Sequence, residues 1–273
     1  MRKLLETLLL SVVDAFFAAR PQPKPALPVL ERCKIISHRG QHDNRTVFEN
    51  TLNAFDRAIQ AGVWGIEFDI RWTRDLKPVV FHDRDLSRLF GEPLVVGEAD
   101  FQDLRARFPM IPSLEEVLAR YGRRVHLMVE LKEETYPRPE RQAENLSALL
   151  SPLKPVKDYH FLSLVPEMFR HVGFVPAAAL LPVAETNIRT LSRLALARGY
   201  AGVAGHYLLV GRRTAALHAA AGQCVGTGYP RSANCLFREA NRGVEWIFSN
   251  HAVAMQRVVD DCRHRLESGT AGR

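Results

Sequence analysis

The sequence predicts an α/β fold: a (β/α)8 TIM barrel with a small insertion after strand 2 and an N-terminal amphipathic helix. Short apolar runs alternate with segments of helical periodicity from residue 34 to residue 265, which indicates parallel strands joined by helices. Several runs end in polar residues, and barrels collect their functional groups at the carboxyl ends of strands. A doubly wound open sheet shares the alternation, but no G-x-G-x-x-G motif follows any predicted strand.

A long irregular insertion interrupts the first half of the predicted barrel. Residues 72–112 are rich in Gly, Pro and Phe and contain no amphipathic segment long enough to be a barrel helix. Ser113 with Glu116 then predicts a capping box. In chain order we predict a strand at 34–37, a helix at 49–61, a strand at 65–71, a hairpin arm at 78–82, a helix at 114–121, a strand at 125–131 and a helix near 139–150.

The second half keeps the strand–helix rhythm without interruption. Asn187 is the predicted cap of one of its helices, and Ser268 to Arg273 are predicted to form a frayed tail. The predicted elements are a strand at 160–164, a short helix at 166–172, a strand at 177–183, a helix at 187–199, a strand at 201–206, a helix at 212–221, a strand at 223–227, a helix at 232–241, a strand at 244–248 and a helix at 252–265.

The strand at 65–71 carries two acids, Glu67 and Asp69. Residues two apart on a strand project from the same face, so Ile66, Phe68 and Ile70 face the other way. Adjacent carboxylates in an apolar strand repel each other, and burying one charge alone costs several kcal/mol. A hard divalent cation removes both problems, because Mg²⁺ and Ca²⁺ take carboxylate oxygens as ligands. The other interpretation is an exposed polar face on an edge strand.

The composition is that of a globular protein with a basic surface. The 273 residues are 47% hydrophobic and 25% charged, and the formal charge of +7 favours phosphorylated small molecules or anionic lipid surfaces as partners. No nucleic acid is expected as a partner, because the chain lacks an aromatic-basic RNA motif and a concentrated basic helix. The four cysteines lack C-x-x-C spacing, which disfavours zinc and indicates unpaired thiols in a reducing compartment. We therefore expect a cytoplasmic protein.

Residues 1–28 are predicted to form an amphipathic helix and a stiff, extended Pro-rich linker. Glu6 and Asp14 interrupt the apolar stretch, so neither a signal peptide nor a membrane span is expected. Residues 4–17 would contact a membrane surface peripherally, or would dock on the barrel or on a second copy of the chain. The apolar stripe of this helix consists of Leu4, Leu5, Leu8, Leu9, Val12, Val13, Phe16 and Phe17.

Five short motifs lie at predicted strand ends and at the start of the first helix. They are H-R-G at 38–40, E-N-T at 49–51, E-x-D at 67–69, H-D at 82–83 and E-x-K at 130–132. In this order and with these gaps, the sequence resembles the glycerophosphodiester phosphodiesterase family. The resemblance implies a TIM-barrel phosphodiesterase domain over residues 29–267 that hydrolyses phosphodiesters with a divalent metal. It also implies that the insertion at 72–112 caps the site.

The resemblance assigns the acids of these motifs to a metal site. Glu67, Asp69 and Glu130 would be the ligands, and such oxygen donors suit Mg²⁺ or Ca²⁺ better than zinc. Glu49 would support these ligands or act as a secondary one, and we place Asn50 with it. A simpler role for Glu49 is to stabilise the dipole of the predicted first helix from its first turn.

Histidines and cations complete the predicted site. Phosphodiester hydrolysis needs one proton removed from the attacking oxygen and another delivered to the leaving alkoxide, and imidazole does both near neutral pH. We predict that His38 and His82 form this pair, without distinguishing acid from base. Arg39 and Lys132 would hold the phosphate. His206 is a weaker candidate, and structural or surface positions are expected for His42, His126, His160, His171, His218, His251 and His264.

Two elements depart from the family pattern. A W-T-x-N element at the seventh strand corresponds here to residues 226–229, where Gly226 replaces the Trp and would empty part of the substrate pocket. The eighth strand, which usually ends in an acid, here ends in Ser249 and Asn250. An emptier pocket would admit a bulkier substrate such as a lysophospholipid.

The expected reaction is metal-dependent hydrolysis of glycerophosphodiesters to an alcohol and sn-glycerol 3-phosphate. Lysophospholipase D and sphingomyelinase D activities are alternatives, although no cysteine lies between Cys33 and Cys224 to staple the loop typical of sphingomyelinases D. A third alternative is a non-catalytic barrel that binds phosphorylated headgroups.

Overall fold

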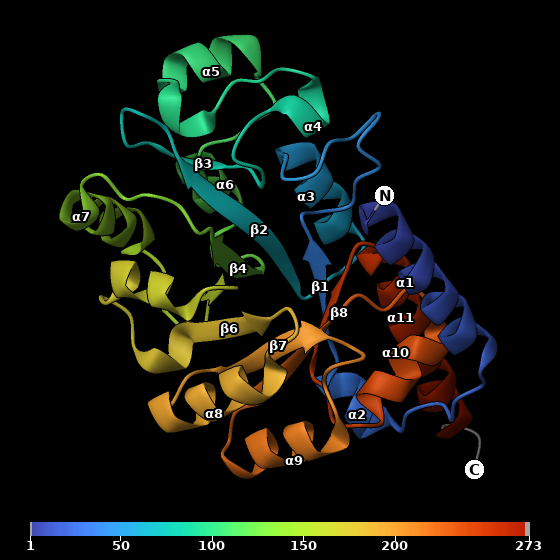
Figure 1. Cartoon of the computed structure of the whole chain (residues 1–273). Coiled ribbons are helices and arrows are strands. Elements are labelled where there is room, and N and C mark those ends of the chain that lie inside the picture. Colours follow the sequence, from blue (N-terminus) through green and yellow to red (C-terminus); the bar gives the residue numbers. More distant parts are fainter. Residues whose placement is uncertain (1, 271–273) are drawn as a thin grey trace.

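Eight parallel strands close into a barrel, which confirms the predicted fold class (Figure 1). The protein, seen here as a computed structural model, is described over residues 2–270, while Met1 and residues 271–273 lie outside the described part. The barrel strands are β1 (Lys34–His38), β2 (Gly65–Trp72), β4 (His126–Leu131), β5 (Tyr159–Ser163), β6 (Leu180–Ala184), β7 (Gly202–His206), β8 (Cys224–Gly228) and β9 (Trp246–Ser249). Because β1 pairs with both β9 and β2, the sheet has no open edge at this point.

Helices surround the barrel and bury its outer face (Figure 1). On β2, Ile66, Phe68 and Ile70 pack into this outer core, so the acids between them point into the barrel as the strand periodicity predicts. The covering helices are α3 (Leu52–Gln60), α6 (Leu114–Tyr121), α7 (Pro139–Leu150), α8 (Ile188–Arg198), α9 (Arg212–Ala220), α10 (Ala233–Ala240) and α11 (Ala252–Thr270), with the 3-10 segments η2 (Pro166–Val172) and η3 (Ala177–Ala179) between β5 and β6.

The first barrel helix begins later than predicted. The Thr51 side chain accepts a hydrogen bond from the Ala54 backbone N–H at 3.3 Å, so α3 begins at Leu52. Glu49 therefore lies in the turn before the helix, and the predicted role in its first turn is wrong. The capping box at Ser113 and Glu116 is confirmed.

Three predictions in the second half also need correction. Residues 177–179 form η3 rather than strand, because the Ala179 N–H bonds back to the Pro176 carbonyl, and β6 begins only at Leu180. Asn187 occupies the N-cap of α8, but its side chain makes no capping hydrogen bond. The last helix continues to Thr270, so the start of the predicted tail is helical, and residues 271–273 lie outside the described part.

The insertion after β2 has a small core of its own. β3 (Pro78–Val80) pairs antiparallel with β2, and the short helices α4 (Ser87–Phe90), η1 (Val96–Glu98) and α5 (Phe101–Arg107) follow. The expectation of an irregular segment is thus only partly right, because one- or two-turn helices are too short to leave an amphipathic pattern. The small core contains Val79, Phe81, Leu86, Val96, Ala99, Leu104, Phe108 and Ile111.

The N-terminal helix, α1 (Arg2–Ala19), lies along α10 at the side of the barrel (Figure 1). Phe17 packs edge-on against Tyr207 at 5.5 Å between ring centroids, whereas Val12 and Phe16 are exposed. Leu4, Leu5, Leu8 and Leu9 of the predicted stripe lie outside the residues whose side chains are described.

The linker after α1 is not extended throughout. Helix α2 (Leu27–Arg32) holds Pro28 in its first turn, where proline costs no hydrogen bond. Across residues 2–270, no helix combines the length and the apolar character that crossing a bilayer requires.

Candidate active site and metal centre

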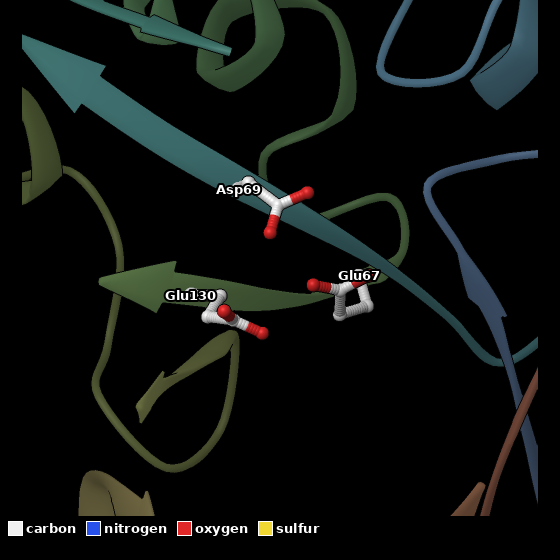
Figure 2. Close-up of side chains that lie close together, drawn as sticks. All are labelled: Glu67, Asp69 and Glu130. Atoms are coloured by element: carbon white, nitrogen blue, oxygen red, sulfur yellow. The ribbon is translucent and has the colours of Figure 1, made fainter. Parts of the chain in front are cut away.

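Three carboxylates meet inside the carboxyl end of the barrel (Figure 2). Glu67 and Asp69 project from β2, and Glu130 projects from β4, where it lies directly beside Asp69 in the strand register. One oxygen of each lies within 4.8 Å of the others, and all three residues are buried. The structure therefore brings together the three predicted metal ligands.

The charges of this acid cluster are only partly balanced by protein groups. Burial raises the pKa of Glu67 well above its usual value, and the charges of Asp69 and Glu130 add to this rise. Burial also raises the pKa of Glu130. Burial acts on Asp69 as well, but Arg39 and Lys132 outweigh it and hold its pKa below the usual range. The cluster is thus short of positive charge on the Glu67 side.

Atom Oε1 of Glu67 is buried and has no hydrogen-bond partner in the described structure. A buried carboxylate oxygen without a donor is costly, and a divalent cation would satisfy it. Donors that are all oxygen atoms fit a hard cation. The residues present therefore fit the divalent metal that the sequence resemblance implies.

A tight turn after β1 places Arg39 over the acids. Arg39 has φ 57° and Gly40 φ 79°, and a Cβ on Gly40 would lie 2.7 Å from Ala54, so only glycine fits there. The Arg39 backbone N–H donates to Glu67 Oε2 at 3.2 Å, and its Nε lies 3.2 Å from Asp69 Oδ2. Asn50 donates from Nδ2 to the same Asp69 oxygen at 2.8 Å.

Lys132 approaches the acids from the end of β4. Its Nζ donates to Glu130 Oε1 at 2.5 Å and to Asp69 Oδ1 at 3.1 Å. Burial alone would lower the pKa of Lys132, but the two carboxylates raise it, so the ammonium stays charged. Arg39 and Lys132 are thus the two cations nearest the acid cluster in the described structure.

Glu49 binds arginines rather than joining the acid cluster. It accepts from Arg39 Nη1 at 2.9 Å, from Arg88 Nη2 at 2.6 Å and from Asn44 Nδ2 at 2.7 Å. Burial would raise its pKa, but these donors hold the pKa at about 2. Arg88, on α4 of the insertion, also donates to Asp83 Oδ2 at 2.6 Å, so the insertion contacts the site.

His38, at the end of β1, is held by Asn250. Its Nδ1 lies 2.6 Å from Asn250 Oδ1, and because an amide oxygen only accepts, Nδ1 carries the proton. Nε2 is then the acceptor nitrogen, which takes a long hydrogen bond from the Tyr229 hydroxyl at 3.5 Å and lies 3.7 Å from Glu67 Oε2. Burial, reinforced by Arg39, lowers the pKa of His38 to about 3, so the ring is neutral.

His82 lies at the border between the barrel and the insertion. Its Nδ1 bonds Asp83 Oδ1 at 2.8 Å, and its side chain is 28% exposed, so it is neither buried nor turned fully into solvent. Burial lowers its pKa, and the nearby Asp69 opposes this effect.

A cavity of about 640 Å³ lies over the acids. Its lining includes His38, Glu67 and Glu130 among the predicted site residues and the weaker candidate His206. His251, expected at a structural or surface position, also lines it. The cavity therefore connects the acid cluster with side chains from several strand ends and from α1.

The space opposite Gly226 is filled rather than empty. A Cβ on Gly226 would lie 2.9 Å from the ring of Phe248 and 3.0 Å from Ala204, so Phe248 occupies the room that a larger residue there would need. Phe248 lines the cavity as well. The expectation that glycine at this position empties part of the pocket is therefore wrong.

Sequence reasoning missed two residues of the site. Nothing in the pattern distinguishes Arg88 from the scattered surface arginines. Tyr229, whose ring packs against His38 at 4.8 Å between centroids, lies in the element where the family pattern fails, which was the only available signal. All four cysteines are free, as the spacing predicts.

Comparisons with known proteins point to one family. Residues 38–162 match the sequence model of the Glycerophosphoryl diester phosphodiesterase family. The chain is 32% identical over 163 residues to the glycerophosphodiester phosphodiesterase of Caldanaerobacter subterraneus, a match that covers 54% of this chain and 63% of that protein. It is 34% identical over 119 residues to the enzyme of that name from Bacillus altitudinis, covering 39% of this chain and 48% of that protein. The aligned region thus spans about half to just under two thirds of these relatives.

Solved structures share the fold. A phosphodiesterase from Oleispira antarctica, in complex with the product sn-glycerol-3-phosphate, superposes with a TM-score of 0.70 at 22% identity and covers 83% of this chain and 96% of its own. A glycerophosphodiester phosphodiesterase from Parabacteroides distasonis gives 0.67 at 19% identity and covers 84% and 98%. Residues 38–162, which hold the first half of the barrel and the acid cluster, are thus similar to the glycerophosphoryl diester phosphodiesterase family.

Proposed function

We propose that this protein is a divalent-metal-dependent phosphodiesterase that hydrolyses glycerophosphodiesters to an alcohol and sn-glycerol 3-phosphate. One observation carries the proposal: Glu67, Asp69 and Glu130 converge beside His38 at one end of a cavity, in a chain similar to this family. The family match favours this activity over the sphingomyelinase D and non-catalytic alternatives.

The proposed metal is Mg²⁺ or Ca²⁺, held by Glu67, Asp69 and Glu130. Their all-oxygen donor set and the unpartnered Oε1 of Glu67 support this choice. When bound, the cation would act as a Lewis acid on the phosphoryl group. Arg39 and Lys132 would add positive charge where phosphoryl oxygens become more negative, Arg39 with its planar fork and Lys132 as a point charge.

The hydrogen-bond partners of the two histidines support different roles. The neutral amide of Asn250 keeps His38 in the tautomer whose Nε2 is the acceptor, so we assign His38 as the general base. Asp83 is an anionic partner that favours a protonated His82, so we assign His82 as the acid that protonates the leaving alkoxide. Water supplies the hydroxyl that ends on phosphorus, and the P–O bond to the alcohol breaks.

Turnover of glycerophosphocholine by the purified full chain tests the proposal. We expect activity to disappear in EDTA and to return with Mg²⁺ or Ca²⁺. His82→Ala should lower kcat by at least about a hundredfold because general acid catalysis is lost, whereas the exposed His264→Ala serves as control. Full activity in chelator would refute the metal site, and near-normal turnover of His82→Ala would refute its role.

We also propose a cytoplasmic location with peripheral membrane contact through residues 4–17. Among the described side chains of this segment, Val12 and Phe16 are 63% and 54% exposed, which supports contact with an apolar phase. Cell fractionation of the wild-type chain and of a Val12→Ser/Phe16→Ser variant measures it. We expect the variant to shift from the membrane to the soluble fraction, and equal distribution would refute the contact.

A further inference from the structure

A second cleft lies at the end of α1, between the linker that follows this helix and helices α9 and α10. It has a volume of about 590 Å³. Residues from three separate segments of the chain line it: Phe17, Arg20, Gln22, Pro23, Arg212, Arg238, Asn241 and Arg242. None of these residues lines the catalytic cavity.

The cleft carries four arginines and no acid among its lining residues. Arg238 and Arg242 share one carboxylate, that of the buried Glu239, at 2.7 Å and 3.2 Å. Arg20 and Arg212 have no acidic partner within ion-pair distance in the described part of the chain. The cleft thus has four guanidinium groups beside one carboxylate, which pairs with only two of them, and it keeps an excess of positive charge.

Contacts within the cleft hold Arg238 and Arg242 in place. Arg242 also donates to the Val210 carbonyl, and the Arg238 guanidinium lies 4.2 Å from the centre of the Phe17 ring. Asn241 donates from Nδ2 to the Pro23 carbonyl at 2.8 Å, which ties the linker to α10. Arg238 and Arg242 are thus held in place by neighbouring groups, while Arg20 and Arg212 are exposed. This arrangement of four cations is partly preorganised for an anion.

Helix α9 adds to the positive potential. Arg212 is its first residue, and Gly211 at the N-cap provides no side-chain oxygen to the N–H groups of the first turn. The positive end of a helix of this length favours an anion nearby. Guanidinium forks match the geometry of phosphate oxygens, which accept several hydrogen bonds at once.

We propose that this cleft binds the phosphate group of an anionic ligand, either a free phosphate monoester or the phosphate of a lipid headgroup. The site is independent of the proposed catalytic activity. Helix α1 separates the two, with Asp14 in the lining of the catalytic cavity and Phe17 in that of the cleft. Tyr207 contacts both of these residues of α1. Its hydroxyl donates to Asp14 Oδ1 at 2.5 Å, and its ring packs against Phe17. A ligand in the cleft therefore lies next to the helix that forms one wall of the catalytic cavity.

Calorimetric titration of the full chain with inorganic phosphate in the presence of chelator tests the free-ligand form. The variant Arg20→Gln/Arg212→Gln removes the two unpaired cations without disturbing Glu239. The control Arg189→Gln/Arg213→Gln removes the same charge from exposed positions outside the cleft. We expect the cleft variant to bind phosphate about tenfold more weakly at one site, and the control to match the wild type.

Co-sedimentation with vesicles tests the lipid form, using phosphatidylcholine vesicles with phosphatidic acid or with phosphatidylglycerol at equal charge. Loss of binding to phosphatidic acid vesicles in the cleft variant alone supports a headgroup ligand. Loss of phosphate binding alone supports a soluble one. Equal behaviour of the cleft variant and the control in both experiments overturns the proposal. Turnover of soluble glycerophosphocholine stays at the wild-type rate in the cleft variant, so a failed proposal here is distinguishable from a failed catalytic one.

Discussion

The two ends of the barrel use buried polar residues in opposite ways. Along β4, His126, Met128 and Glu130 project from one face into the barrel, so a single strand runs from an imidazole through a thioether to a carboxylate. At the carboxyl end, the acid cluster is charged and Glu67 keeps an oxygen without a partner. At the amino end the polar side chains inside the barrel are neutral rings, with the Lys34 ammonium 4.8 Å from the centre of the Trp64 ring.

At the amino end the imidazoles pair with each other and with tryptophans. His126 Nε2 and His160 Nδ1 lie 2.7 Å apart, and Trp64 stacks on His126 at 4.2 Å between ring centroids. Trp246 meets His160 edge-on at 5.0 Å. Burial lowers the pKa of His126 to about 4 and that of His160 to about 3, so both rings are neutral at physiological pH.

This contrast separates stability from function within one barrel. At the amino end, the neutral rings of His126, His160 and Trp246 pack against one another and fill the barrel's interior, although the Trp246 indole N–H has no hydrogen-bond partner in the described structure. The acids at the carboxyl end repel one another and need a cation, so this end holds a ligand at a cost in stability. Substitutions at the two ends should therefore affect different measurements.

Glu67→Gln should have the largest effect on activity. The substitution removes one of three ligand carboxylates, and we expect kcat/KM to fall on the order of a thousandfold as several kcal/mol of metal-dependent stabilisation are lost. Without metal, the free energy of unfolding should stay equal or rise, because one repulsive charge is gone. Steady-state turnover and urea unfolding in chelator measure the two quantities.

The matched control is Glu115→Gln, an exposed acid paired with Lys77 at 2.8 Å on the surface. It should change neither quantity by more than a small amount. A large loss of stability in Glu67→Gln without metal would contradict the contrast between the two ends.

Trp246→Ala should have the opposite profile. This side chain is 3% exposed and packs with Ile36, Met128 and Leu162 inside the barrel. We expect a loss of about 3–5 kcal/mol in the free energy of unfolding, as for other buried aromatic truncations. Turnover per folded molecule should change little, because the acids are at the other end. Thermal unfolding and an active-site titration measure both, and a selective loss of turnover would show that the two ends are coupled.

The contrast also explains how much the sequence could predict. Strand periodicity placed Glu67 and Asp69 on one face, and register then brought Glu130 beside Asp69. The first rests on local geometry, which a sequence records, whereas Glu130 was predicted only through the motif resemblance. The pairing of His126 with His160 joins residues 34 apart, and no local pattern marks it.

The same limit applies at the carboxyl end. The sequence showed that Asn250 stands where the family usually has an acid. Its hydrogen bond to His38 could not be predicted, because the two residues are 212 apart in sequence and are brought together by the pairing of β9 with β1. Arg88 belongs to a single-turn helix that is too short for a periodic signal. The opening of space at Gly226 was mispredicted because the compensating ring, Phe248, lies on the neighbouring strand.

Part of the pH dependence of stability should come from the amino end. Unfolded histidines titrate near pH 6.5, while the folded His126 and His160 titrate near 4 and 3. Between these values the unfolded chain binds more protons, so the free energy of unfolding falls as the pH drops from about 6.5 towards 4, by on the order of 6 kcal/mol for the two histidines together. His126→Gln should flatten this slope in urea titrations, and the exposed His264→Gln should not. An unchanged slope in His126→Gln would place the responsible group elsewhere.

Asn250→Asp should have the smallest effect and is the most specific test. It replaces the neutral amide that holds His38 with a carboxylate. A carboxylate 2.6 Å from Nδ1 stabilises the protonated ring, so the pKa of His38 rises from its value of about 3. A general base must be neutral, so the acidic limb of the pH profile of kcat/KM should move up by about one unit or more. Asn234→Asp, a similar change in the first turn of α10 outside both the cavity lining and the acid cluster, should leave the profile in place. If the limb stays fixed in Asn250→Asp while the protein remains folded, His38 is not the base, and the neutral pair would serve stability at this end as its counterpart does at the other.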